Sequence, residues 1–348
     1  MPPTKSPRRA QLVNGALVAL AFGLLGLVVY QNRVEIRRVF QKPVLYRYFV
    51  VGFGLYLSAL VITFVRWHRL VRAQGLVFSL RDAVRLGFIG NVFNLVIPGA
   101  VGGDVIKAAF LCRMQPDKKP QAVASMVIDR ILGLLGLFLL AGVAGLVNWR
   151  TVDPQVRFLI GLVWGAIAAG VTGLAVAFSP GLYRPLNRLV AGRGRVEAAV
   201  RELESIGMAY RKRLGTVVAM LGLAVACHSL FVVAFYSASA ALFETMPTLA
   251  QHYLMVPLTL FTTAVPIPFG ALGLSEQISG RLFAMVHHAD GAIAMIAFRI
   301  LMYANGAFSA IVYLANLRQV RDMEEDVETG AVALDPIEPT LYSASDRP

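Results

Sequence analysis

Cysteine is scarce in this 348-residue chain, which also lacks the motifs that mark most catalytic and metal sites. The two cysteines, Cys112 and Cys227, form no CxxC pair and show no ligand spacing to histidine, which argues against a disulfide framework or a zinc site. The five histidines are expected to be interfacial or packing residues. No HExxH, P-loop, Ser/His/Asp set or GxGxxG between strand and helix is present. We therefore expect no enzymatic activity, no metal and no cofactor.

Charged residues are also few, at 15%, whereas 57% of the residues are hydrophobic. Several apolar runs approach the ~20 residues that a helix needs to cross about 30 Å of hydrocarbon. No Pro-, Ser- or Gly-rich linker separates two soluble regions, so a single membrane domain is predicted. The net charge of +13 lies in loops between apolar runs. Anionic headgroups explain that placement better than nucleic acid, and we expect no nucleic-acid partner.

The apolar runs predict an all-α polytopic membrane protein with six full transmembrane helices. These are Leu12–Tyr30, Phe49–Val65, Val123–Val147, Phe158–Phe178, Leu214–Phe243 and Gly291–Leu317. The first run is longer than the core of a signal peptide and has no small-residue cleavage site. It is therefore predicted to be an uncleaved span.

Two further apolar stretches, Ala83–Arg113 and Tyr253–Met285, are interrupted by helix-breaking residues. The breaking residues that we single out are Pro98, Gly99, Gly102, Gly103, Pro268, Gly270 and Gly273. Each half holds about 10–16 residues, too few to span at 1.5 Å per residue. Non-helical backbone at membrane depth is tolerated only inside protein or beside a water-filled cavity. Each stretch is therefore predicted to form a broken, re-entrant helical hairpin.

The distribution of basic residues predicts that both termini are cytoplasmic. With that orientation, the cytoplasmic regions hold 21 membrane-proximal lysines and arginines and the outer loops hold 7. The outer loop 31–48 is unusually basic and is predicted to be an interfacial segment. The stretch Arg193–Arg213 is basic and amphipathic, which predicts a cytoplasmic surface helix on anionic lipid.

The same topology divides the chain into two halves, about 12–147 and 158–317. Each half reads span, span, broken hairpin, span, so three full crossings per half require an inverted repeat. Inverted repeats whose broken helices meet near the midplane are typical of transporters, and the breaks mark the substrate site. Residues 1–317 are thus predicted to form one transmembrane domain. The acidic segment 318–348 is predicted to be a disordered cytoplasmic tail.

Polar residues around the first interruption are candidates for function. Asp104 is either a helix N-cap or a carboxylate that faces a cavity or a partner, and Lys107 lies three residues later on the same face. Arg130 either extends to the interface or points inward, to Asp104 or to a lipid phosphate that its planar guanidinium can bind with two hydrogen bonds. Asn94 either bonds a neighbouring helix or lines the pocket.

Glu276 repeats this pattern after the second interruption. It either favours the first turn of a helix or balances a nearby cation. Arg299 lies in the middle of the last apolar run, and a mid-span arginine nearly always has a partner or lines a polar path. Glu276 is its candidate partner, in a pair that is either purely structural or part of the substrate path.

The segments GNVFNLVIPGAVGGDVIKAAFL and ASMVIDRILGLLGL resemble the lysylphosphatidylglycerol synthase transmembrane-region family, also called flippase-like membrane proteins. That family shows an Asn before a Pro, then Pro-Gly, Gly-Gly-Asp and an Asp-Arg pair. The matching residues are Asn94, Pro98, Gly99, Gly102, Gly103, Asp104, Asp129 and Arg130. A second region matches at Pro268, Gly270, Gly273 and Glu276. Ala271 replaces a glycine there, and Lys107 stands near the usual place of an arginine.

The resemblance covers most of residues 12–317 and implies a flippase-like domain in the inner or plasma membrane. Well-known members add a soluble synthase domain, which we do not expect in a chain that ends soon after its last span. The implied partner is a membrane lipid: an anionic or aminoacylated phospholipid, or a lipid-linked envelope precursor. The expected substrate-binding residues are Asn94, Asp104, Lys107, Arg130, Glu276 and Arg299.

Three alternatives stay open at this point. One is an accessory protein of an envelope glycosyltransferase or lipid-modifying enzyme, acting through the basic helix and the acidic tail. The second is an intramembrane enzyme on a lipid-linked phosphate, for which the sequence offers no nucleophile. The third is a proton-coupled small-solute transporter, in which paired carboxylates carry protons.

Overall fold

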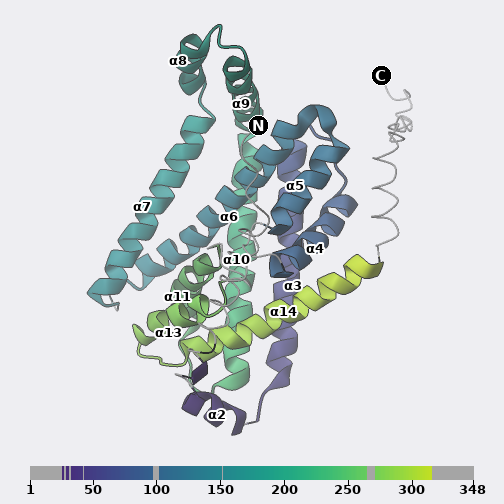
Figure 1. The fold of residues 1–348 in the computed structure, drawn as a ribbon. Coiled ribbons are helices and arrows are strands. Elements are labelled where there is room, and N and C mark those ends of the chain that lie inside the picture. Colours follow the sequence, from purple (N-terminus) through teal and green to yellow (C-terminus); the bar gives the residue numbers. More distant parts are fainter. Residues whose placement is uncertain are drawn as a thin grey trace, which may run out of the picture.

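The computed structural model describes residues 33–41, 43–96, 102–150, 152–264 and 271–315, together with Gly26, Val29 and Tyr30. These residues form helices joined by short connections, and they contain no strand (Figure 1). The α-helices are α2 (Arg33–Gln41), α3 (Tyr46–Ala73), α4 (Leu80–Val96), α5 (Gly102–Met114), α6 (Lys119–Val147), α7 (Pro154–Ala177), α8 (Pro180–Val190), α9 (Arg195–Lys212), α10 (Leu214–Leu242), α11 (Leu249–Phe261), α13 (Leu274–Ala284) and α14 (Gly291–Ala315). Two 3₁₀ turns are η1 (Pro116–Lys118) and η2 (Thr262–Ala264).

Five of the six predicted spans are present as α3, α6, α7, α10 and α14. Each is long and apolar enough to cross a membrane. The sixth, Leu12–Tyr30, lies almost wholly outside the described residues. The all-helical, multi-pass membrane architecture is therefore confirmed, while the number of six spans stays a prediction.

Helix α3 continues well past Val65, where the sequence prediction ended it. The prediction stopped there because Arg66 is a cation at the edge of an apolar run. In the structure Arg66 is buried and paired, and the following residues Trp67, Leu70 and Val71 pack in the core. Because the charge of Arg66 is compensated by its ion-pair partner, the helix can continue through this buried position.

Helices α3 and α10 form an antiparallel pair at the centre of the fold. Near the start of α3, the hydroxyl of Ser237 donates to the carbonyl of Tyr48 over 2.8 Å. At the other end of α3, Arg213 donates to the carbonyl of Arg72 over 2.8 Å. The two helices therefore run past each other along their full lengths, and the remaining helices pack around them.

The two interrupted stretches form two pairs of short helices, α4 with α5 and α11 with α13. The breaks themselves, residues 97–101 and 265–270, lie outside the described residues, and with them Pro98, Gly99, Pro268 and Gly270. The α4–α5 pair follows α3 and lies toward the α8–α9 end of the molecule (Figure 1). The α11–α13 pair follows α10 and lies toward the α2 end. The hairpins thus start from opposite ends of the central pair.

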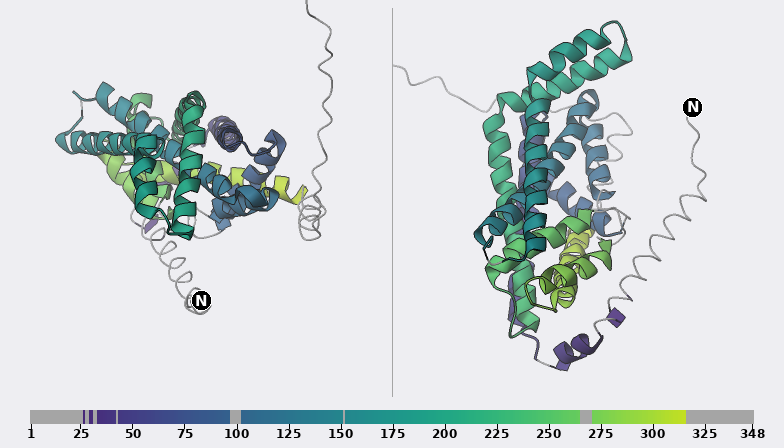
Figure 2. Two further views of the ribbon diagram at one scale, coloured as in Figure 1. Left: turned by 90° about the horizontal axis from the view of Figure 1, so that it is seen from above. Right: turned by 90° about the vertical axis from the view of Figure 1, so that its left-hand side faces the viewer.

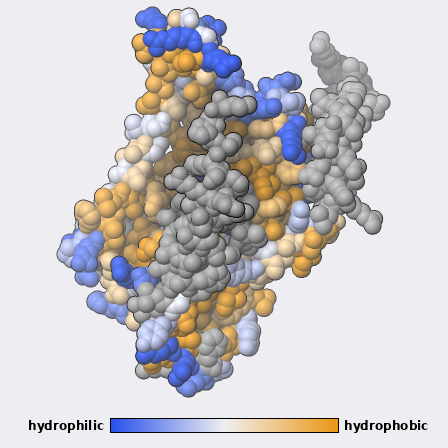
Figure 3. Space-filling model, in the orientation of Figure 1, coloured by the Kyte–Doolittle hydropathy of each residue, from blue (hydrophilic) through white to orange (hydrophobic). Residues whose placement is uncertain are grey.

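Helices α8 and α9 form a hairpin that projects beyond the end of the bundle, with α2 at the opposite end (Figure 2). Helix α9 is the surface helix predicted from Arg193–Arg213. Hydrophilic residues gather at these two ends, and much of the visible surface between them is hydrophobic (Figure 3). This banding is the surface expected of a protein whose middle faces hydrocarbon.

Candidate ion-pair sites at the two hairpins

A first ion-pair cluster lies at the start of α5. Asp104 is the third residue of that helix and is only 8% exposed. Its Oδ1 lies 2.7 Å from Nζ of Lys107, one turn later, and its Oδ2 accepts a hydrogen bond from Arg130 of α6. The Arg130 side chain is 48% exposed, whereas that of Lys107 is 10% exposed. One carboxylate is therefore shared by a buried cation and a cation that is half open.

Close packing between the two halves of the first hairpin positions Asp104. A Cβ on Gly103 would lie 1.9 Å from the carbonyl oxygen of Gly90, so no larger residue fits there. Asn94 accepts the backbone N–H of Gly103 through its Oδ1 at 2.8 Å. This bond satisfies one of the free N–H groups at the start of α5. Asn94 thus bonds the neighbouring helix, which was one of its two predicted roles.

A second buried ion pair next to this cluster was missed by the sequence analysis. Arg66 of α3 contacts Asp129 of α6, with Nε–Oδ1 at 2.7 Å and Nη2–Oδ2 at 3.0 Å. The guanidinium fits against Gly133, where a Cβ would lie 3.3 Å from Nη2. Asp129 and Arg130 are adjacent, but successive helical side chains point about 100° apart. They therefore meet different partners on α3 and α5.

The charges around the first hairpin do not cancel. Arg66, Lys107 and Arg130 supply three positive charges, while Asp104 and Asp129 supply two negative charges. Lys107 also lies 5.1 Å from the ring centroid of Trp67, a cation–π distance that helps to hold it in place. The formal surplus of one positive charge includes the half-open Arg130, which is the chemistry of a site for an anion.

A closed ion pair lies at the second hairpin. Arg299 of α14 donates to Oε1 of Glu276, as predicted, and the two residues are 3% and 0% exposed. The other oxygen of Glu276 accepts the backbone N–H of Gly273 at 2.7 Å. Nearby, Thr262 donates to Ser275 over 2.8 Å. Within this pair the two charges balance, and both partners are buried.

The structure therefore divides the predicted site residues between two places. Asp104, Lys107 and Arg130 come together at the first hairpin, with Asn94 beside them in a backbone contact. Glu276 and Arg299 meet at the second.

Two helices join these places. Arg130 and Phe138 of α6 contact α5 and α11, about 12 Å apart along the helix. Arg299 and Ser309 of α14 contact α13 and α4, about 15 Å apart. Among the described residues, no group of three or more His, Cys, Asp or Glu could hold a metal ion.

Comparison with known proteins gives one match. A family model described as the lysylphosphatidylglycerol synthase TM region matches residues 12–308 of the chain. Searches of curated proteins and of solved structures gave no match.

Proposed function

This chain belongs to the lysylphosphatidylglycerol synthase transmembrane-region family, a membrane domain related to lipid handling, and we propose that it moves a phospholipid or a lipid-linked envelope precursor between leaflets. The observation that carries the proposal is the net-positive cluster at the first hairpin, with the half-open Arg130 at its edge. The membrane is the inner or plasma membrane. In this proposal both termini are cytoplasmic, because that orientation puts most membrane-proximal lysines and arginines, those of α8–α9 included, on the cytoplasmic side.

An inverted repeat fits the packing of the fold. Exchanging α3 with α10, α4 with α11, α5 with α13 and α6 with α14 maps each principal contact among these helices onto another such contact. Since α3 and α10 are antiparallel, the exchange reverses direction through the membrane. The charged residues follow the same exchange. Asp104 and Glu276 are each third in their helix, and their arginine partners follow 26 and 23 residues later.

The first cluster suits the headgroup of an anionic lipid. The free N–H groups at the start of α5 carry the positive end of a helix dipole, which favours phosphate. Arg130 can add two charge-assisted hydrogen bonds, and Asp104 balances the cations while the site is empty. The acyl chains stay in hydrocarbon while the headgroup passes between the hairpins.

The second cluster completes the path in this proposal. In a transporter built from an inverted repeat, the two halves exchange roles as access alternates between the two sides. A half-open first cluster and a closed second cluster correspond to one such state. In the opposite state, Arg299 and Glu276 separate, and Arg299 meets the headgroup.

The test is a leaflet-exchange assay with purified protein in liposomes. Fluorescent phospholipids report exchange through a membrane-impermeant quencher, and wild type is compared with Asp104→Asn, Arg130→Gln and Arg299→Gln. Glu197→Gln is the matched control, because Glu197 belongs to a surface ion pair on α9 with Arg201, whose side chain is 69% exposed. We expect exchange by wild type and the control only. Folded wild type that exchanges none of an anionic, a zwitterionic and a cationic lipid would refute the proposal.

The second candidate is a non-catalytic accessory protein of an envelope glycosyltransferase or lipid-modifying enzyme. The projecting α8–α9 hairpin favours it, because basic helices outside the bundle can dock a partner as well as lipid. If this second candidate is right, charge reversals on α8–α9 abolish function in cells, whereas Asp104→Asn reduces it only slightly. If the protein transports lipid, Asp104→Asn abolishes function and the charge reversals on α8–α9 reduce it only slightly.

A further inference from the structure

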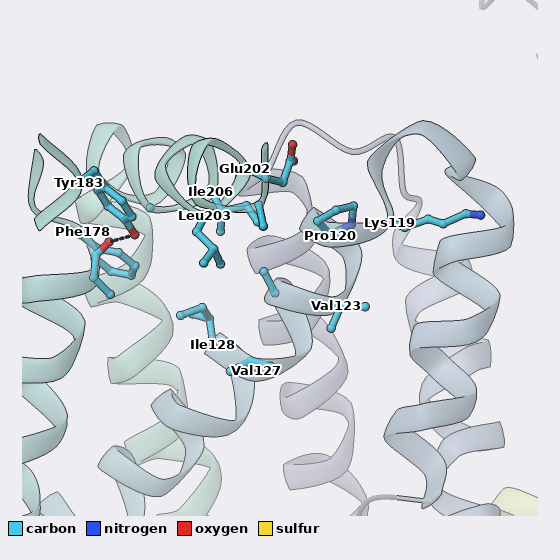
Figure 4. Close-up of a pocket in the computed structure, with 14 residues that line it drawn as sticks. Lys119, Pro120, Val123, Val127, Ile128, Phe178, Tyr183, Glu202, Leu203 and Ile206 are labelled. Atoms are coloured by element: carbon cyan, nitrogen blue, oxygen red, sulfur yellow. Dashed lines mark hydrogen bonds between the residues drawn. The ribbon is translucent and has the colours of Figure 1, made fainter. Parts of the chain in front are cut away.

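A cleft of about 670 Å³ lies at the base of the projecting α8–α9 hairpin. It is bounded by the start of α6, the α7–α8 junction and one face of α9. Leu203 and Ile206 point from α9 toward Val127 and Ile128 of α6, with Phe178 along one side (Figure 4). The volume falls within the range of about 300–1,000 Å³ typical of small-molecule sites.

The lining of the cleft is almost entirely apolar, and its polar groups stand at one edge. Glu202 and Lys119 lie at the upper edge in Figure 4, with Lys119 extending outward. On the α6 side, Val123 and Val127 are 47% and 52% exposed. Since α6 and α7 are both candidate spans, the cleft lies where the spans give way to the α8–α9 hairpin. At such a position, the apolar part of the cleft is expected to adjoin the hydrocarbon and its polar edge the headgroup layer.

The hairpin above the cleft carries a surplus of positive charge. Residues 179–213 contain eight lysines and arginines and three glutamates. Each glutamate already has a partner: Glu197 pairs with Arg201, Glu202 accepts from Gln121, and Glu204 accepts from Asn187 at 2.6 Å. The hairpin whose helix α9 lines the cleft therefore carries more basic than acidic residues, and Lys119 stands at the edge of that apolar cleft. This combination matches an amphiphile with a negative head and a hydrocarbon tail.

We propose that this cleft binds one acyl chain of an anionic glycerophospholipid, whose headgroup lies against Lys119 and the basic α8–α9 hairpin. The ion-pair residues Asp104, Lys107, Arg130, Glu276 and Arg299 do not line this cleft, and binding there does not require lipid transport. Its occupant ties the hairpin to the membrane surface, because filling the cleft joins α9 to α6 through hydrocarbon contacts.

Two adjacent alanines of α9 provide a matched test. Ala199 lines the cleft and Ala198 does not, and both are exposed, so a larger side chain is tolerated at either place. Ala199→Phe fills part of the cleft, and Ala198→Phe adds the same ring outside it. Delipidated protein is titrated with phosphatidylglycerol or with phosphatidylcholine of identical chains, and native mass spectrometry counts the bound lipids.

We expect wild type to hold one phosphatidylglycerol at least about tenfold more tightly than phosphatidylcholine. Ala199→Phe should weaken that binding about tenfold, and Ala198→Phe should leave it within about twofold. Lys119→Gln, which leaves the cleft open, should reduce the preference for phosphatidylglycerol. Equal binding by the two phenylalanine variants would overturn the site. Equal binding of the two lipids by wild type would overturn the anionic headgroup.

Discussion

The buried pair of Glu276 and Arg299 allows a quantitative test of how the second hairpin is held. Changing Glu276 to Gln removes the negative charge but keeps an oxygen that can accept the N–H of Gly273. Arg299, 3% exposed, then remains as a buried cation without its carboxylate. Breaking one side of a buried ion pair costs about 3–5 kcal/mol. By contrast, replacing both charges by neutral or apolar side chains of similar volume is often nearly neutral.

The assay is a double-mutant cycle of unfolding free energies in detergent micelles. It uses Glu276→Gln, Arg299→Met and the double variant. We expect each single variant to lose about 3–5 kcal/mol and the double variant to lose less than either one. The surface pair Glu197–Arg201, whose arginine side chain is 69% exposed and whose glutamate side chain is 22% exposed, serves as the control. Breaking this control pair should lower the unfolding free energy by only about 0.3–0.5 kcal/mol. Losses that add in the Glu276–Arg299 cycle would refute the reasoning, because additivity means that the charges do not stabilise each other.

Three further predictions concern the first hairpin and the backbone of the second. Gly103→Ala should destabilise the protein by about 1–3 kcal/mol or more, because its Cβ would collide with the carbonyl oxygen of Gly90. Gly54→Ala is the control, because a Cβ at Gly54 would meet open space, and thermal unfolding measures the stability of both variants. Arg130→Gln should cost less than about 1 kcal/mol of stability, because Arg130 is half exposed, yet abolish exchange of anionic lipid in liposomes. Gly273→Ala should cost about 1–2 kcal/mol in the same unfolding assay, because Gly273 has a φ of 82°.

Hydropathy and spacing predicted much of this fold, since apolar length decides which helices can cross a membrane. The same patterns predicted the Asp104–Lys107 and Glu276–Arg299 contacts. The Asp104–Lys107 contact follows from the three-residue spacing on a helix, and the Glu276–Arg299 contact follows from the need of a mid-span arginine for a partner. The Arg66–Asp129 pair was missed because Arg66 ends an apolar run, where an arginine usually reaches the interface. Only the packing of α3 on α6 shows that it turns inward.

The two hairpins share a plan but differ at one position that sets their charge. Three residues after Asp104, α5 carries Lys107, which pairs with that carboxylate. Three residues after Glu276, α13 carries Ser279, whose hydroxyl donates to the carbonyl of Gly291 at 2.7 Å. The second carboxylate therefore balances one arginine, while the first is shared by two cations. Because an anion needs a cation that is not fully neutralised, the proposed lipid transport assigns headgroup capture to the first hairpin. In the same proposal, Arg299 of the second hairpin becomes available to a headgroup only after its ion pair with Glu276 opens.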